Sequence, residues 1–305
     1  MKQHVHDMII VGGGPAGYSA ALYAARANMD VLLVEKMYPG GQMTQTHQID
    51  NYPGFVDGID GFTLAMKMQQ QAERFGAKTL FEEVLRMNLT SSIKEIHTTN
   101  QTLYAKTVVL AMGASPRTLS LKEEATLIGK GVAYCAACDG AFFKGKDVVV
   151  VGGGNTAVAD ALLLSHIANS VALIHRRDQL KAEKILQNQL LKSENIKIYW
   201  NHTVKEIQYD DKVQGVIIED VQTHKQQQIN TQGIFVSIGR IPATSILQGI
   251  LLDAQGYIIA SEDTQTNIPG VYAVGDIRTK PLRQVVGAVS DGAIAIHQAQ
   301  IYLEQ

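Results

Sequence analysis

The chain has 305 residues, of which 46% are hydrophobic and 18% charged, and its formal net charge is -2. This length exceeds the usual size of one hydrophobic core, so two domains are expected. The near-neutral charge gives no reason to expect binding to nucleic acid or to an anionic membrane, and no apolar run approaches the roughly 18 residues of a membrane span. Residues 1–7 lack the pattern of an export signal, so we expect a cytoplasmic protein whose cysteines are catalytic rather than structural.

A glycine-rich turn between two predicted strands is the first motif along the chain. Residues 8–11 predict a buried parallel strand, residues 18–28 a helix, and residues 31–34 a second strand that ends at Glu35. Between the first strand and the helix lies Gly12–Gly17, a GxGxxG turn in the strand–helix context that dinucleotide binding requires. This combination predicts a nucleotide-binding unit rather than an ordinary glycine-rich loop.

Each glycine of this motif has an expected role. Gly12 permits the tight turn, Gly14 lets a pyrophosphate approach the backbone, and Gly17 allows close packing of the helix on the strand. The pyrophosphate is expected at the helix N-terminus, where free N–H groups and the helix dipole favour an anion. Glu35 can accept hydrogen bonds from ribose hydroxyls, whereas its charge would repel a 2′-phosphate.

A long loop follows this first unit. Residues 37–61 contain two glycine turns and have no counterpart in the second half of the chain, so we expect them to be functional. An amphipathic helix over about residues 62–75 and alternating strands come next. Residues 108–113 then predict an apolar strand that ends in a glycine.

The only two cysteines, Cys135 and Cys138, form a CxxC motif that is followed at once by Asp139. Cysteines at this spacing can form a disulfide across one turn, and a neighbouring carboxyl can move protons to or from a thiolate. A structural zinc site would need further ligands, yet the chain has no other cysteine, and no histidine lies within ten residues of the motif. We therefore expect a redox-active cysteine pair and no metal site.

The nucleotide-binding pattern occurs again 140 residues further along the chain. Residues 148–151 predict a strand, Gly152–Ala157 a second glycine turn, residues 158–168 a helix, and residues 171–174 another strand. The two copies align without a gap, so two nucleotide-binding domains are expected in the one chain.

The residues after the second strand differ between the copies. Glu35 of the first copy is replaced by His175, and Arg176, Arg177 and Lys181 follow. Arginine binds a 2′-phosphate through bidentate, charge-assisted hydrogen bonds. The first copy is therefore expected to bind FAD and the second NADPH rather than NADH. The alternative is that these cations bind no ligand and are simply solvated side chains at the start of a helix, because a helix is expected from about residue 179 to residue 193.

The C-terminal segment predicts a strand over residues 270–276 and a helix from about residue 287 to residue 303. It is too short to form a domain of its own, so we expect it to pack on the first domain. The expected fold class is α/β, with two Rossmann-like nucleotide-binding domains, the second inserted into the first. Residues 1–117 and 244–305 would form the FAD domain, and residues 118–243 the NADPH domain that carries the CxxC motif.

Together these motifs make the chain similar to low-molecular-weight, bacterial-type NADPH–thioredoxin reductases over essentially its whole length. The matching segments are Gly12–Tyr18, Gly40–Gln42, Asn51–Gly54, Cys135–Gly140, Gly152–Ala157, His175–Asp178, Gly275-Asp276 and Arg283-Gln284. The resemblance implies a homodimeric FAD flavoprotein that passes electrons from NADPH through FAD to Cys135–Cys138 and then to thioredoxin.

The resemblance also implies roles for single residues. Cys138 would exchange electrons with the flavin, Cys135 would attack the thioredoxin disulfide, and Asp139 would supply or take protons. The inserted domain would rotate between these steps, and the chain crossings that contain Pro116 and Pro242 would act as hinges.

The cofactor residues are expected as follows. For FAD they are Gly12, Gly14, Pro15, Ala16, Gly17, Glu35, Lys36, Gly40, Gly41, Gln42, Asn51, Val84, Gly113, Gly275, Asp276, Arg283, Gln284 and Val285. For NADPH they are Gly152, Gly153, Gly154, Asn155, Thr156, His175, Arg176, Arg177, Lys181, Ile238 and Gly239. Contacts for docking thioredoxin are expected at Lys130, Phe142 and Phe143, with core packing as the alternative for the two phenylalanines.

Three residues depart from the family pattern. Lys181 stands where a third arginine is usual, Met112 where threonine is common, and Ala137 where threonine or valine is common. Two other functions remain open from the sequence. One is the same scaffold with a ferredoxin or flavin donor, or with another dithiol acceptor protein; the other is a nucleotide-binding sensor without catalysis. The arginine pair argues against a changed donor, and the intact CxxC motif argues against a sensor.

Overall fold

The computed structural model describes residues 4–46 and 48–305, so residues 1–3 and position 47 of the expected first domain lie outside the described residues. The chain divides into two compact units. Unit 1 runs up to Ser115 and resumes over Ile241–Gln305, and unit 2 spans Pro116–Arg240. Among the described residues, every helix is too short or too polar to cross a membrane.

Unit 1 is built on a mixed sheet of seven strands in the order β3-β2-β1-β6-β5-β4, with β17 also paired to β6. The strands are β1 (His6–Val11), β2 (Val31–Glu35), β3 (Lys78–Phe81), β4 (Val84–Asn88), β5 (Lys94–Thr98), β6 (Thr102–Leu110) and β17 (Val271–Ala273). Strands β3, β2, β1, β6 and β17 pair in parallel, whereas β4 and β5 are antiparallel additions. The C-terminal segment therefore completes the sheet that the N-terminal segment begins.

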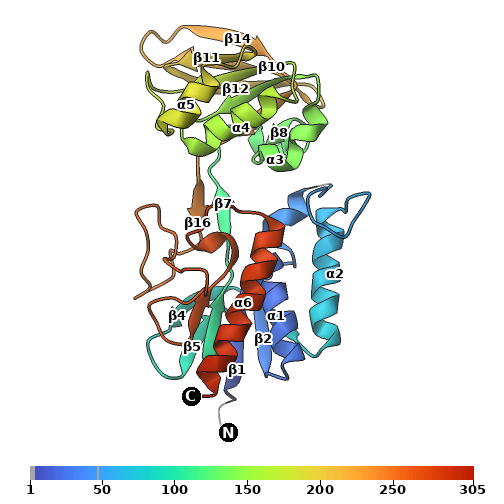
Figure 1. The fold of residues 1–305 in the computed structure, drawn as a ribbon, viewed down its shortest axis with the longest axis vertical. Coiled ribbons are helices and arrows are strands. Elements are labelled where there is room, and N and C mark those ends of the chain that lie inside the picture. The colour runs from blue at the N-terminus through green and yellow to red at the C-terminus, as the bar shows by residue number, and fades with distance from the viewer. Residues whose placement is uncertain (1–3, 47) are drawn as a thin grey trace. The chain divides into compact units, whose positions relative to one another are not determined.

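Helices and loops cover both faces of this sheet. The helices are α1 (Pro15–Arg26), α2 (Gly61–Arg74) and α6 (Val285–Leu303), with 3-10 turns η1 (Gly41–Gln45) and η4 (Gly275–Ile277). On one face Met8 and Ile10 of β1 pack with the alanines of α1 and α6, which lie side by side (Figure 1). On the other face Ile9 and Val11 pack with Ile258 from the loops between residue 242 and β17. This alternation follows from the period of two in a strand that is buried on both faces.

Unit 2 contains a parallel five-stranded sheet in the order β11-β10-β9-β15-β8 and an antiparallel sheet in the order β12-β13-β14. The strands are β8 (Val132–Ala133), β9 (Asp147–Val151), β10 (Ser170–His175), β11 (Ile196–Trp200), β12 (His202–Tyr209), β13 (Val213–Asp220), β14 (Gln226–Asn230) and β15 (Gly233–Val236). The helices are α3 (Ala136–Asp139), α4 (Asn155–Ser165) and α5 (Lys184–Leu190), with 3-10 turns η2 (Glu124–Leu127) and η3 (Gly140–Phe143).

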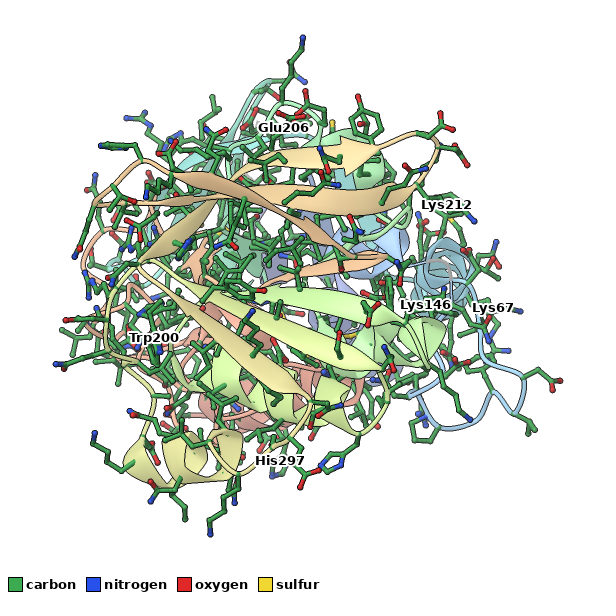
Figure 2. All side chains as sticks on the ribbon, turned by 90° about the horizontal axis from the view of Figure 1, so that it is seen from above. Lys67, Lys146, Trp200, Glu206, Lys212 and His297 are labelled. Atoms are coloured by element: carbon green, nitrogen blue, oxygen red, sulfur yellow. A yellow bond between two sulfur atoms is a disulfide. The ribbon has the colours of Figure 1, made fainter. Side chains whose placement is uncertain are left out.

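The core of unit 2 also alternates along its central strand. Val148 and Val150 of β9 pack with α4, whereas Val149 and Val151 pack with residues of β12 and β13. The three-stranded sheet thus covers the face opposite α4. Its outer surface is polar, and Glu206 on β12 and Lys212 in the turn after β12 are both exposed (Figure 2). The predicted α/β fold class, with parallel sheets of the nucleotide-binding type, is confirmed.

One predicted helix begins later in the structure than the sequence predicts. A helix was expected from about residue 179, but α5 begins at Lys184. The N–H groups of Lys181 and Ala182 donate to the carbonyl of Gly153, and the N–H of Glu183 donates to the side chain of Asn155. Residues 181–183 therefore bond to the glycine turn. These hydrogen bonds prevent the helix from starting at residue 179, although the local pattern favours it.

The two chain crossings between the units pair with each other. They form strands β7 (Ala114–Pro116) and β16 (Arg240–Pro242), which make a two-stranded sheet. Both expected hinge prolines, Pro116 and Pro242, are the last residues of these strands.

Candidate active site

Cys135 and Cys138 form a disulfide, with sulfurs 2.11 Å and Cα atoms 5.3 Å apart. Cys135 precedes the single turn α3 in an extended conformation, and its carbonyl accepts the N–H groups of Cys138 and Asp139 at 3.2 and 3.0 Å. Buried Ala136 anchors this turn, whereas Ala137 is exposed and both cysteines are partly exposed. The turn thus holds the two sulfurs at bonding distance near the surface, with the Asp139 carboxyl on the same turn.

The expected docking residues near the disulfide divide into two kinds. Phe143 is buried, and its ring packs edge-to-face on Phe235 with centroids 5.1 Å apart, so it belongs to the core of unit 2. Phe142 is 46% exposed, and Lys130 is exposed and pairs with Asp211 at 2.9 Å. Only Phe142 and Lys130 remain available to contact a partner protein.

In unit 1 the glycine turn has the geometry that its sequence predicts. Gly12 has a φ of 108° and donates its N–H to the carbonyl of Val34 at 2.8 Å. A Cβ on Gly17 would lie 1.9 Å from the Gly12 carbonyl oxygen, so no side chain fits there. A Cβ on Gly14 would meet nothing within 4 Å, which leaves open space at the start of α1. Helix α1 has Pro15 in its first turn and no side-chain cap, so its first N–H groups face that space.

Residues after β2 close onto this turn. The Glu35 carboxylate accepts the N–H of Gly13 at 2.6 Å through one oxygen and the N–H of Lys36 at 2.7 Å through the other. Gly40 donates its N–H to the carbonyl of Gly13 at 2.7 Å. Lys36 is exposed, and its side chain pairs with Glu83. Glu35 therefore holds the turn itself, while a carboxylate has lone pairs left for a ribose hydroxyl.

The parallel strands β1, β6 and β17 end at one edge of the sheet, because Leu110 pairs with both Val11 and Ala273. Their carboxyl ends bring the glycine turn together with Gly113 and Gly275, which follow β6 and β17 and have φ values of 69° and 72°. Ligands of open α/β sheets bind beyond this edge. Asp276 lies in η4 at the same edge, whereas Val84 is the first residue of β4 and is partly buried.

Two long-range contacts join further residues of unit 1 that were expected at the FAD site. The side chain of Gln42 donates to the carbonyl of Ala114, and the side chain of Asn51 donates to that of Gln284 at 3.0 Å. Gln284 precedes α6, whose first residue is Val285. The loop of residues 37–61, expected to be functional, is thereby attached to the start of α6. Gly41, which begins η1, lies close to Gly14, since a Cβ on Gly41 would be 3.7 Å from the Gly14 Cα.

A cluster of buried charged side chains lies beside this edge, and it was not predicted from the sequence. Asp291 of α6 accepts hydrogen bonds from Arg278 at 2.8 and 3.0 Å, from Lys280 at 2.8 Å and from the N–H of Gly275 at 2.8 Å. Burial would raise the pKa of Asp291, but the hydrogen bonds from Arg278 and Lys280 outweigh it and lower the pKa. Arg283 stacks over the Tyr257 ring at 4.0 Å. The cluster fixes the turn at Gly275, and no local motif marks it.

In unit 2 the second glycine turn is equally constrained. A Cβ on Gly152, whose φ is 153°, would lie 2.4 Å from the carbonyl oxygen of Ser237. A Cβ on Gly154 would meet nothing within 4 Å, and α4 begins there without a side-chain cap. Asn155 and Glu183 exchange two hydrogen bonds of 3.0 and 2.8 Å. The turn is therefore held from the side of residues 181–183, as the first turn is held by Gly40.

His175 lies beneath this turn and the neighbouring cations lie outside it. The His175 ring is buried, its Nε2 is 2.9 Å from the carbonyl oxygen of Gln179, and a Cβ on Gly153 would be 2.2 Å from the ring. Burial lowers the pKa of His175. Arg176, Arg177 and Lys181 are exposed. The positive charge at this position thus comes from the three exposed side chains, and His175 packs as a neutral ring under the backbone.

The remaining predicted residues of unit 2 flank the turn. Thr156 is exposed in the first turn of α4, Ile238 is 37% exposed, and Gly239 follows with a φ of 104°. One contact here was missed from the sequence. Ser237 donates to the carboxylate of Asp160 on α4 at 2.5 Å, and burial raises the pKa of Asp160 although this hydrogen bond lowers it.

Comparison with known proteins agrees with this geometry. The chain is 43% identical over 309 residues to the thioredoxin reductase of Peptoclostridium acidaminophilum, covering 99% of this chain and 98% of that protein. It is 40% identical over 306 residues to the thioredoxin reductase of Bacillus subtilis, covering 100% and 96%. The crystal structure of thioredoxin reductase from Streptococcus pyogenes superposes with a TM-score of 0.92 at 43% identity, over 98% of both chains. Residues 6–292 match the family described as pyridine nucleotide-disulphide oxidoreductase, which uses a flavin and a pyridine nucleotide. The predicted resemblance is therefore confirmed, and the chain belongs to the pyridine nucleotide-disulphide oxidoreductases.

Proposed function

We propose that the chain is an NADPH-dependent flavoprotein disulfide reductase that reduces thioredoxin through FAD and the Cys135–Cys138 disulfide. The observation that carries the proposal is this disulfide, formed on a partly exposed turn of a chain that has two open glycine turns. Relatives of 40–43% identity that are named thioredoxin reductases support the same acceptor.

Unit 1 is the proposed FAD domain; the sequence predicts its boundaries at 1–117 and 244–305, close to the unit's own limits at Ser115 and Ile241. Its residues fit a dinucleotide with a flavin, because the open space at Gly14 faces uncapped N–H groups of α1. In addition, Nε of Arg283 is buried without a hydrogen-bond partner among the described residues. A buried donor of this kind calls for a polar partner, which a bound cofactor would supply. Asp276, Gln42 and Asn51 are the further residues proposed to hold it.

Unit 2 (Pro116–Arg240) is the proposed NADPH domain, which the sequence predicts over residues 118–243. The space at Gly154 fits a pyrophosphate at the start of α4. Arg176 and Arg177 are proposed to bind the 2′-phosphate, with Lys181 as a weaker third cation. His175 would act by supporting the turn from beneath, since its ring is buried and its pKa is lowered.

FAD, when bound, would supply a two-electron carrier between the hydride donor and the disulfide. Two electrons and two protons convert the disulfide into two thiols. The Cys135 thiolate then attacks one sulfur of the thioredoxin disulfide and forms a mixed disulfide. Attack of Cys138 on Cys135 releases the reduced thioredoxin and restores the Cys135–Cys138 bond. Asp139, on the same turn, is proposed to give and take the thiol protons.

The experiment that tests this function replaces one cysteine at a time. Cys135→Ser and Cys138→Ser should each reduce NADPH-driven reduction of thioredoxin to background, because either change destroys the two-electron couple. Both variants should still bind FAD, and NADPH should still bleach the flavin absorbance under anaerobic conditions. Ala137→Thr, between the two cysteines and exposed, is the matched control and should stay active. Near-normal turnover of Cys135→Ser would refute the mechanism.

The assembly and location are also proposals. A homodimer is supported by the resemblance and by large apolar side chains exposed on unit 1, namely Tyr23 of α1, Phe62 of α2 and Phe75 directly after α2. Light scattering after size-exclusion chromatography would test it, and a monomeric mass would contradict it. The cytoplasm is proposed because dithiol catalysts of this kind operate where thiols are kept reduced.

A further inference from the structure

Three metal-ligating side chains converge at the start of the unit 1 sheet, at the opposite edge from the glycine turn. His6 is the first residue of β1, and His4 lies two residues before it in the segment that leads into the strand. Asp30 directly precedes β2, the neighbouring strand. Nε2 of His4 lies 2.8 Å and Nδ1 of His6 3.0 Å from the same oxygen, Oδ2 of Asp30.

We propose that His4, His6 and Asp30 bind one divalent transition-metal ion, of which zinc fits best. The three ligand atoms lie within 4.8 Å of one another. Zinc accepts imidazole nitrogen and carboxylate oxygen together, and sites with three protein ligands leave the fourth position to water. Tetrahedral ligands at zinc bond lengths are about 3.3–3.5 Å apart. The observed separations of 2.8 and 3.0 Å would therefore open by only about half an ångström.

The backbone around these ligands is already held in place. Oδ2 of Asp7 accepts the N–H of Asp30 at 3.0 Å, and Oδ1 of Asp7 pairs with Lys106 at 2.7 Å. These contacts fix the backbone at Asp30, one of the three proposed ligands. The side chain of His6 is 14% exposed and that of His4 is 70% exposed. One ligand is thus fixed in the structure while the other leaves a path from solvent.

The sequence predicts no metal site because no local motif marks these three ligands. Here the ligands come from segments 24 and 26 residues apart, and only the pairing of β1 with β2 brings them together. From His6 to Gly12 the strand runs six residues, or about 20 Å at 3.3 Å per residue. The ion would therefore brace β1 against β2 and take no part in electron transfer.

The test uses the oxidised, FAD-loaded protein, because reduced Cys135 and Cys138 would offer competing thiolates. Zinc chloride is titrated by calorimetry at mildly alkaline pH, where imidazole is mostly neutral. We expect one ion per chain with a dissociation constant on the order of micromolar. Cobalt(II) should give the visible bands of a nitrogen- and oxygen-ligated ion without thiolate charge transfer. Zinc should also raise the melting temperature, because it binds only the folded chain.

Three variants decide the outcome. His4→Ala alters an exposed side chain and leaves the strand intact, so it should weaken zinc binding at least about 10-fold without changing the FAD spectrum. Asp30→Asn should do the same, and His4→Ala with His6→Ala should abolish stoichiometric binding. His224→Ala is the matched control, since His224 is an exposed histidine that faces a single carboxylate, Glu219, at 3.4 Å. No bound zinc in the unmodified protein, or unchanged affinity in the double variant, would overturn the proposal.

Discussion

The glycine turns of unit 1 and unit 2 share their backbone but differ at two positions. Gly12 and Gly152 both have positive φ, and Gly14 and Gly154 both leave open space. The first difference is Gly17, where a Cβ would lie 1.9 Å from a carbonyl oxygen, whereas the second turn carries Ala157 at the equivalent position. Helix α1 therefore approaches its strand more closely than α4 does.

The second difference concerns the residue below the turn. Glu35 holds the N–H of Gly13 with a charged carboxylate, whereas His175 fills the same place with a buried ring. Exposed Arg176 and Arg177 follow the histidine, while exposed Lys36 follows the glutamate. The comparison shows that the glycine spacing makes the pyrophosphate cradle, and that the residues after the second strand decide which nucleotide fits.

The largest effect on cofactor binding is expected from Gly17→Ala. This change gives the first turn the alanine that the second turn has at position 157. The new Cβ cannot be accommodated without moving α1, so FAD affinity should fall at least about 100-fold, or about 2.8 kcal/mol. Fluorescence titration of the apoprotein with FAD measures it. The reciprocal control, Ala157→Gly, should retain FAD and lose at most about 1 kcal/mol of stability. FAD binding of normal strength in Gly17→Ala would contradict the packing argument.

A smaller effect is expected from removing the cations after β10. Each charge-assisted hydrogen bond contributes about 1.5–3 kcal/mol. Arg176→Ala with Arg177→Ala should therefore raise KM for NADPH about 100-fold, leaving kcat and the KM for NADH within about threefold. Fluorescence of Trp200, the only tryptophan, reports binding without turnover because its ring lies beside that of His175, with ring centroids 6.3 Å apart.

Lys192→Ala, which removes another exposed cation of unit 2, is the control for this double variant and should leave both cofactors unaffected. Equal kcat/KM for NADH and NADPH in the unmodified protein would contradict the proposal that Arg176 and Arg177 bind the 2′-phosphate. It would also reopen the choice of electron donor.

The smallest effect is a pH dependence confined to unit 2. Burial lowers the pKa of His175 in the folded protein, so below pH 6.5 the unfolded chain binds more protons than the folded one. Stability should therefore fall as the pH drops from about 6.5 toward the folded pKa, by at most about 1.4 kcal/mol per pH unit. Urea unfolding followed by Trp200 fluorescence measures the slope. His175→Asn should remove it, and exposed His166→Asn should not. The same slope in His175→Asn would contradict this cause.

The sequence predicts the parts of the site that short segments determine. The turns Gly12–Gly17 and Gly152–Ala157, the strands beside them and the Cys135–Cys138 pair all follow from spacing within about 35 residues. The hydrogen bonds that join these motifs to residues outside them were not predictable, because no spacing pattern marks the partner. Gly40 reaches the Gly13 carbonyl, Lys181 reaches that of Gly153, and Asp291 reaches Gly275.

One wrong prediction and one choice that the sequence left open have the same physical origin. The helix expected from about residue 179 starts late because residues 181–183 bond to the glycine turn instead of to one another. Phe143 suited a docking role by its position near the cysteines, yet its ring fills a place beside Phe235, which is distant in sequence. Local pattern fixes neither outcome, because tertiary hydrogen bonds and packing outweigh propensity differences of less than 1 kcal/mol per residue.

The pairing of β17 with β6 has a consequence for how the chain is made. At 5–20 residues per second, Val271 leaves the ribosome roughly 10–30 s after Ser115. Unit 2 is contiguous and is complete before that strand exists. Protease treatment of nascent chains stalled before Val271 should therefore spare unit 2 and digest unit 1, and the reverse pattern would contradict this order. Until β17 and α6 are synthesised, β6 exposes the edge that β17 will cover. Unit 1 is therefore the first unit to begin translation and the last to complete its fold.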